Sequence, residues 1–322
     1  MFKKFALAVA ATAALGAVAQ DFPTRNITMV VPYAAGGPTD TVARVLAQAM
    51  TKPIGHTVVV ENKPSAGGLV GAETVKNAKP DGYTILIHHI GMATTPTLYR
   101  QALRFDPVKD FEYIGLVNEV PMTIIGKPGF APKDAKELAA YMKANKEKVT
   151  YANAGIGAAS HLCGMLFMSA VGVDVLTVPY NGTSPAMNDL LGGQVDFMCD
   201  QTTSTTGQIK GGKVKVYGIT SDKRVPSLPD VPTLAEQGIK GGEVAIWHGL
   251  YAPKGTPKPV IDKLVAALQD AIKDETVKKR FADLGAETMP VSQATPEALR
   301  KHLKAEIDKW GPLIKKAGVY AD

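Results

Sequence analysis

The 322-residue sequence contains little of what several classes of protein require. It has 2 cysteines, 7% aromatic residues and no block of like charges, and no long apolar run follows residue 19. Two cysteines do not make a disulfide scaffold. Nucleic-acid binders concentrate positive charge in a patch with interleaved aromatic residues, whereas Lys and Arg alternate with Asp and Glu here. Nucleic acid is therefore not an expected partner, and the 45% hydrophobic content indicates a globular core.

The N-terminal residues have the pattern of an export signal. Lys3 and Lys4 precede an apolar stretch over 5–18, and Ala17-Val18-Ala19 supplies the small residues of a signal-peptidase site. The stretch is shorter than the roughly 20 residues that a membrane-spanning helix needs. We predict that residues 1–19 are removed after Ala19 and that the mature protein is extracytoplasmic. Loss of the two lysines lowers the net charge from +6 to +4.

The two cysteines, Cys163 and Cys199, would then meet an oxidising compartment in which they can form one internal disulfide. They can equally be two small buried residues that never meet, because a buried free cysteine packs like a hydrophobic residue. A disulfide needs Cα atoms within about 7 Å, and spacing along the chain does not show that distance. Both interpretations stay open at this point.

Alternating strand and helix patterns predict an α/β fold with two domains. Runs rich in β-branched residues at 27–31, 57–60 and 83–87 each lead into a Gly-containing turn or a helical stretch. Strands that are apolar on both faces and alternate with helices form doubly wound, mostly parallel sheets. The pattern restarts near residue 120. The C-terminal third is helical, so we expect it to pack back on the first domain.

The expected boundaries are residues 20–119 plus 248–322 for domain 1 and residues 120–247 for domain 2. The chain then crosses between the domains near Glu119 and again near Trp247. Two crossings permit a hinge between the domains. A ligand that contacts both domains favours the closed form because it binds that form more tightly than the open one. This is the architecture of a two-domain binding protein.

Several catalytic and cofactor motifs are incomplete. Gly155-Ile156-Gly157 with Ser160 resembles a dinucleotide fingerprint, but Ser replaces the third glycine and Asp174 begins the next strand instead of ending it. Residues 182–185, Gly-Thr-Ser-Pro, lack the closing glycine of a nucleophile elbow. The six histidines include no i, i+4 pair of the kind that binds zinc on a helix. We therefore expect no enzyme activity, no cofactor and no metal.

Three loops at predicted strand ends are rich in hydrogen-bond donors but contain no Lys or Arg. They cover residues 36–40, 153–160 and 200–203. Glycines let backbone N–H groups approach a ligand, and a helix N-terminus carries about half a positive charge. One such loop alone is more simply a well-capped helix start. Two of them facing each other across a cleft would bind a ligand with a carboxylate at each end.

These loops lie in motifs by which the sequence resembles the tripartite tricarboxylate transporter receptors, also called Bug receptors. The first is Pro32-Tyr33-Ala34-Ala35-Gly36-Gly37-Pro38-Thr39-Asp40, followed by Arg44. The resemblance extends over essentially the whole mature chain. The remaining motifs are VENKP at 60–64 with Gly67-Gly68, PDGYT at 80–84, AGIG at 154–157 with His161-Leu162, VPYNG at 178–182, LGGQVD at 191–196, PDVPT at 229–233 and WHGL at 247–250.

The resemblance implies a monomeric periplasmic solute-binding protein with a Venus-flytrap cleft of the type II periplasmic-binding-protein architecture. It would deliver a small carboxylate to the membrane subunits of a tripartite tricarboxylate transporter. The loops at 37–40 and 154–160 would receive the ligand carboxylates, partly through water, and Asp200 would help to select the ligand. The predicted ligand-binding residues are Gly37, Pro38, Thr39, Asp40, His88, Asn153, Ala154, Gly155, Ile156, Gly157, Ser160, Asp200, Thr202, Trp247 and His248.

The expected ligand is a dicarboxylate, aliphatic or aromatic, and His88, Trp247 and His248 favour an aromatic one such as a phthalate-type diacid. If either histidine is protonated, ligand binding takes up a proton and weakens as the pH rises. If both are neutral, they only form hydrogen bonds. The alternative function is an exported or NAD-dependent α/β enzyme acting on a small carboxylate, which a turnover assay would detect.

Overall fold

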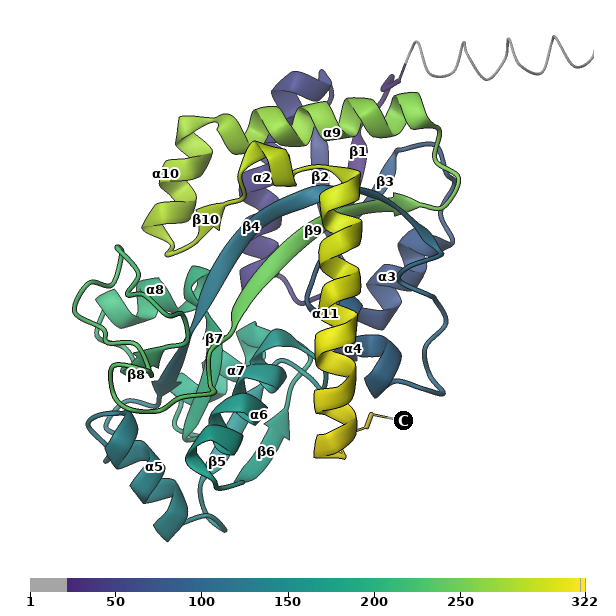
Figure 1. Ribbon diagram of the computed structural model, residues 1–322. Helices are drawn as coiled ribbons and strands as arrows, with labels where there is room; N and C mark the ends of the chain where they lie inside the picture. Colours follow the sequence, from purple (N-terminus) through teal and green to yellow (C-terminus); the bar gives the residue numbers. More distant parts are fainter. Residues whose placement is uncertain (1–21, 319, 322) are drawn as a thin grey trace, which may run out of the picture.

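One mixed sheet runs through the computed structural model, which describes residues 22–318, 320 and 321 (Figure 1). The strand order is β2-β1-β3-β9-β4-β7-β5-β6, and β8 and β10 both pair with β4. The export signal predicted over residues 1–19, with its cleavage site, lies outside the described residues. The strands are β1 (Ile27–Val31), β2 (Val58–Asn62), β3 (Thr84–His89), β4 (Phe111–Gly126), β5 (Thr150–Asn153), β6 (Leu176–Pro179), β7 (Phe197–Gln201), β8 (Lys215–Ile219), β9 (Ala245–Pro253) and β10 (Glu287–Thr288).

Helices cover both faces of this sheet, as strands that are apolar on both faces require. Met29 and Val31 of β1 pack into one hydrophobic cluster, and Val30 between them packs into the other. The predicted α/β fold is confirmed. The helices are α2 (Pro38–Ile54), α3 (Leu69–Lys76), α4 (Gly91–Leu98), α5 (Ala135–Ala144), α6 (Ala159–Val171), α7 (Thr183–Leu191), α8 (Thr202–Lys210), α9 (Lys258–Lys273), α10 (Glu275–Asp283) and α11 (Pro296–Ala317).

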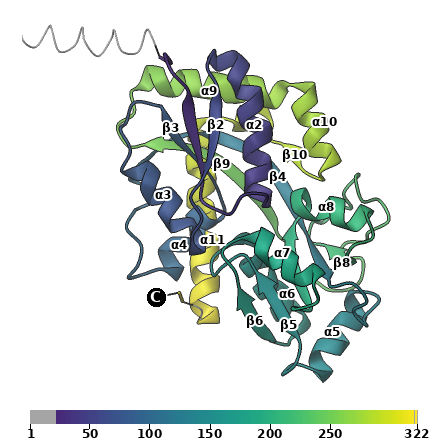
Figure 2. The same ribbon diagram turned by 180° about the vertical axis from the view of Figure 1, so that it is seen from behind.

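The first half of the sheet consists of β2, β1, β3, β9 and the beginning of β4. β1 pairs in parallel with β2 and β3, and β9 is antiparallel to β3. Helix α2, in front in Figure 2, packs against α9, and α11, in front in Figure 1, packs against α4 and β4. The helical C-terminal third therefore returns to the first half.

The second half of the sheet consists of the end of β4 with β7, β5, β6 and β8. Tyr151 of β5 pairs in parallel with Phe197 of β7 and with Thr177 of β6. β4 is antiparallel to both β7 and β8. Helices α5 to α8 lie beside these strands (Figure 1). Among the described residues, none of the helices combines the length and the apolar character that crossing a membrane needs.

Two long strands connect the halves. β4 and β9 pair antiparallel from Phe111 opposite Pro253 to Pro121 opposite Ala245, after which Met122 to Gly126 of β4 pair with the second half. Glu119 and Trp247, the predicted crossing residues, are partners in this register. Because both crossings are adjacent extended strands, bending the two together would move one half of the sheet relative to the other.

Candidate ligand-binding site

A small cavity of about 20 Å³ lies where four helices begin. Their N-caps are Gly37 for α2, Ala158 for α6, Gly182 for α7 and Gln201 for α8. One water molecule needs about 10–15 Å³, so this conformation encloses very little space. The lining residues are Tyr33, Gly37, Pro38, Thr39, His89, Ala154, Ala158, Ala159, Ser160, Thr183, Asp200 and Gln201.

The backbone of these helix starts gives the cavity its electrostatic character. Within the described part of the chain, none of the four N-caps makes a side-chain hydrogen bond to its helix. The first N–H groups of a helix have no intrahelical acceptor, and the helix dipole places positive charge beside them. No lysine or arginine is among the described residues that line the cavity. The arrangement suits an anion without using a cationic side chain.

The loop before α2 is held by Asp40, whose carboxylate is turned away from the cavity. Asp40 accepts hydrogen bonds from Gly36 N, Arg44 Nε and Asn62 Nδ2, each at 2.9 Å. Burial alone would raise the pKa of Asp40, but the bonds from Arg44, Gly36 and Asn62 outweigh it and lower the pKa. Gly36 has φ +77°, which strongly favours glycine. Asp40 therefore shapes the loop from behind.

The loop before α6 uses its glycine N–H groups internally. Gly155 N donates to Asn153 Oδ1 at 2.9 Å, and Gly157 N donates to His161 Nδ1 at 3.2 Å. The sequence analysis expected glycine N–H groups to reach a ligand, and for these two the structure contradicts it. The N–H groups available at the cavity are those of the first turn of α6, because a helix start leaves them without an internal acceptor.

The two halves of the sheet touch directly around the cavity. Ser184 Oγ at the start of α7 donates to Ala35 O at 2.8 Å. On the opposite side, Tyr99 Oη after α4 donates to Ile156 O at 2.6 Å. These bonds join the loop before α2 to α7 and the end of α4 to the loop before α6. The structure is thus a conformation in which both halves close on the cavity.

Asp200 is the carboxyl group that lines the cavity. It is the residue before the last of β7 and is buried, and burial raises its pKa to about 7 despite hydrogen bonds from Gln201, Thr183 and Ser204 that lower it. Its Oδ2 atom has no hydrogen-bond partner among the described residues, and the same holds for Oε1 of Gln201 beside it. A protonated Asp200 has an O–H group available for a ligand acceptor.

The histidines predicted to face the ligand lie behind the cavity wall. His248 Nε2 is 3.3 Å from Thr39 Oγ1, and its Nδ1 is 2.9 Å from Asn118 Oδ1. His88 accepts a bond from the backbone N of His89, and His89 is the one that lines the cavity. Burial lowers the pKa of both His88 and His248 to about 3. Burial thus favours neutral rings, the second of the two alternatives in the sequence analysis, and the pH dependence of binding through these histidines stays a prediction.

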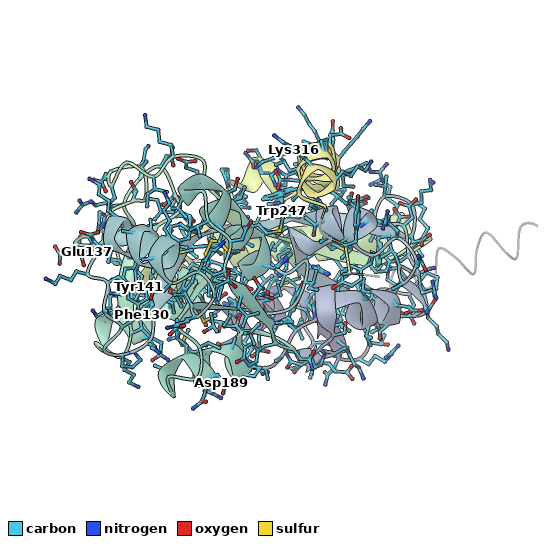
Figure 3. All side chains as sticks on the ribbon, turned by 90° about the horizontal axis from the view of Figure 1, so that it is seen from below. Phe130, Glu137, Tyr141, Asp189, Trp247 and Lys316 are labelled. Atoms are coloured by element: carbon cyan, nitrogen blue, oxygen red, sulfur yellow. A yellow bond between two sulfur atoms is a disulfide. The ribbon has the colours of Figure 1, made fainter. Side chains whose placement is uncertain are left out.

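Trp247 and Thr202 are also away from the cavity. Trp247 Nε1 donates to Glu306 Oε2 of α11 at 3.2 Å, and Figure 3 shows Trp247 beside that helix. Thr202 Oγ1 donates to Gly285 O at 2.9 Å. Neither residue lines the cavity. Trp247 therefore gives no support to the preference for an aromatic ligand.

The structure brings together part of the predicted set and adds residues to it. The predicted residues that line the cavity are Gly37, Pro38, Thr39, Ala154, Ser160 and Asp200; the others, Asp40, His88, Asn153, Gly155, Ile156, Gly157, Thr202, Trp247 and His248, do not. The sequence analysis missed Tyr33, His89, Ala158, Ala159, Thr183 and Gln201. Four of the six were within reach of the sequence: Tyr33 stands inside the first quoted motif, Ala158 and Ala159 stand inside the loop at 153–160, and Gln201 stands inside the loop at 200–203.

Cys163 and Cys199 form a disulfide, with Cα atoms 6.1 Å apart. Cys163 lies one turn into α6, three residues after Ser160, and Cys199 directly precedes Asp200. The disulfide therefore joins two elements whose ends line the cavity. This decides a question that the sequence left open.

Comparison with known proteins agrees with this architecture. The profile of the family described as tripartite tricarboxylate transporter family receptor matches residues 42–319. The UPF0065 protein in the TAR-I ttuE-ttuC' intergenic region of Agrobacterium vitis is 50% identical over 94% of this chain and 87% of its own length. The periplasmic binding protein BugD superposes with a TM-score of 0.90 at 57% identity, and the match covers 94% of this chain and all of BugD.

A second solved structure is that of MatC from Rhodopseudomonas palustris with bound malate. It has a TM-score of 0.87 and 39% identity, and the match covers 91% of this chain and all of MatC. The resemblance stated from sequence motifs is therefore confirmed. The chain belongs to the tripartite tricarboxylate transporter receptor family, a family of substrate-binding receptors.

Proposed function

We propose that this receptor captures a short aliphatic dicarboxylate between the two halves of the sheet and delivers it to the membrane subunits of a tripartite tricarboxylate transporter. The proposal depends on one observation: helix starts without side-chain caps, from both halves of the sheet, meet at one cavity. None of the described residues that line this cavity is a lysine or an arginine. One carboxylate would accept bonds from the start of α2 and the other from the start of α6.

A short aliphatic acid is favoured over an aromatic one on two grounds. The closed cavity is only about 20 Å³, and Trp247 contacts Glu306 instead of lining it. MatC, the relative with 39% identity, was solved with malate. Because the closed cavity has room for about one water molecule, it must widen for any diacid, and a short one requires the least widening.

Capture would require the two halves to separate and close again. The proposed units are residues 20–119 plus 248–322 and residues 120–247, with the hinge in the paired strands β4 and β9. A ligand that contacts both units favours closure by its differential affinity. The protein would act as a periplasmic monomer, exported with cleavage after Ala19. Small-angle scattering should show a smaller radius of gyration with a saturating ligand, and an unchanged radius would contradict the hinge.

The ligand class is tested by thermal unfolding of the mature protein with a panel of acids, followed by calorimetry. The panel contains succinate, malate, adipate, phthalate and the monocarboxylate butyrate. A ligand at 100 times its Kd should add about 2.7 kcal/mol to the free energy of unfolding. We expect the largest shift with a four-carbon diacid, and none with butyrate. NMR of the recovered ligand should show it chemically unchanged. A panel without any diacid response would refute the proposal.

A further inference from the structure

Tyr33 and His89 form a stacked pair on the cavity wall contributed by the first half. Tyr33 follows β1 and His89 ends β3, and these neighbouring parallel strands end at the same edge of the sheet. The two ring centroids are 4.6 Å apart and the ring planes differ by 17°. Both residues line the cavity, yet neither was among the predicted ligand-binding residues.

The Tyr33 hydroxyl is buried without a hydrogen-bond partner among the described residues. The residue is 6% exposed, so solvent does not replace that partner. Burial, with a further contribution from Tyr99, raises the pKa of Tyr33 well above its usual value, so the group remains a neutral O–H donor. Leaving a buried polar group unpaired is costly to the folded state. A site that tolerates this cost beside a cavity is one at which a ligand completes the bond.

His89 is restricted to one tautomer by a backbone contact. Its Nδ1 atom accepts a hydrogen bond from Gly91 N at 3.0 Å, so that nitrogen carries no proton. Burial, followed by the neighbouring His88 and His248, lowers the pKa of His89 well below its usual value, so the ring is neutral. A neutral imidazole has one N–H group. In His89 it must be at Nε2, which makes that atom a donor.

We propose that Tyr33 Oη and His89 Nε2 together bind one ligand carboxylate as a pair of neutral donors. This inference rests on the proposed function, because it assigns two side chains to the same dicarboxylate. A carboxylate has two acceptor oxygens and no donor, so it can accept a hydrogen bond from each of the two groups at once. The pair would add side-chain selectivity to the less directional attraction of the helix starts, and it would do so without a charged residue.

The test compares Tyr33→Phe with Tyr251→Phe. Tyr251 is a matched control because its hydroxyl is also buried and unpaired among the described residues, but it packs against Phe111 and Tyr113 and does not line the cavity. Both variants keep the ring and remove an unpaired hydroxyl, so neither should lower the melting temperature of the ligand-free protein. Calorimetry with the best diacid of the panel should show about a tenfold loss of affinity for Tyr33→Phe and none for Tyr251→Phe.

His89 is tested by a conservative and a non-conservative variant. His89→Gln offers an amide oxygen for Gly91 N and an amide N–H for the ligand, so affinity should stay within about threefold of the parent. His89→Phe keeps the stacked ring and removes the donor, so affinity should fall at least tenfold. Circular dichroism and melting temperature check that both variants fold.

Three outcomes would overturn the inference. Parental affinity in Tyr33→Phe would remove the hydroxyl from the site. If Tyr33→Phe lowers both the melting temperature and the affinity, the hydroxyl contributes only to packing. Equal losses in His89→Gln and His89→Phe would show that a donor is not what matters. If the parent binds a diacid in each case, the proposed function survives and only this inference fails; a parent that binds no diacid refutes both.

Discussion

Some helices that begin away from the cavity have a side-chain cap that the four helices at the cavity lack. Asp134 and Thr295 cap α5 and α11, and accept bonds from Glu137 N at 2.8 Å and Ala298 N at 3.2 Å. At the cavity, α2, α6, α7 and α8 begin without such a bond from their N-cap side chains. A capping side chain would occupy the N–H groups that an anion needs. Among the described residues, α3, α4 and α9 also begin without a side-chain cap, so the feature that marks the cavity is that four uncapped helix starts meet there.

The largest effect is expected from placing a cap where the cavity has none. Ala158, the N-cap of α6, has an extended backbone with φ −67° and ψ 160°, which is the conformation of a capping residue. In Ala158→Asp the new carboxylate would accept from the first-turn N–H groups and repel the ligand. We expect about a 100-fold loss of diacid affinity by calorimetry, with helical circular dichroism retained.

Ala158→Ser separates capping from charge. A serine cap is worth about 1 kcal/mol and carries no charge, so ligand binding should weaken by only about fivefold. The two variants together divide the effect into competition for N–H groups and electrostatic repulsion. Unchanged affinity in Ala158→Asp would show that the start of α6 does not bind the ligand.

The next effect is the pH dependence of binding through Asp200. Burial raises its pKa to about 7, so the ligand-free protein loses this proton as the pH rises from 7 to 8.5. An anionic ligand favours the protonated form, so binding takes up a proton and affinity falls with rising pH, by at most tenfold per pH unit. Asp200→Asn keeps an N–H donor and has no carboxyl to titrate. It should bind with a flat profile over this range, and the same slope in both proteins would exclude Asp200.

A smaller effect is expected from the loop that Asp40 holds. Asp40→Ala removes the acceptor for Gly36 N, Arg44 Nε and Asn62 Nδ2. The loop before α2 would lose its internal support while the protein stays folded. We expect about 2 kcal/mol of lost stability by denaturant unfolding and about a fivefold loss of ligand affinity. Parental affinity by calorimetry would mean that Asp40 has no part in shaping the site.

The smallest effect on binding is expected at a cap outside the cavity. Thr295→Ala removes the bond from Ala298 N at the start of α11. Stability should fall by about 1 kcal/mol in denaturant unfolding, and diacid affinity should not change. A substantial loss of affinity here would weaken the distinction between the two sets of helix starts.

Much of the fold followed from local patterns in the sequence. The run at 27–31 is β1, and the helical C-terminal third packs on the first half of the sheet. Fewer of the site residues could be predicted from the sequence. Alternation along β3 places His88 and His89 on opposite sides, but it does not say which side holds the cavity. The position of the cavity relative to β3 depends on the pairing of β3 with β9, in which His89 is opposite His248.

The sequence by itself determined the strand and helix periods, the family and the presence of donor-rich loops without lysine or arginine. These properties depend on residues close together along the chain. The tertiary structure decided that Cys163 meets Cys199, that the N–H groups of Gly155 and Gly157 bond to nearby side chains, and that burial raises the pKa of Asp200. Each of these depends on burial or on the exact direction of a group, which segments distant in the sequence impose when they pack together.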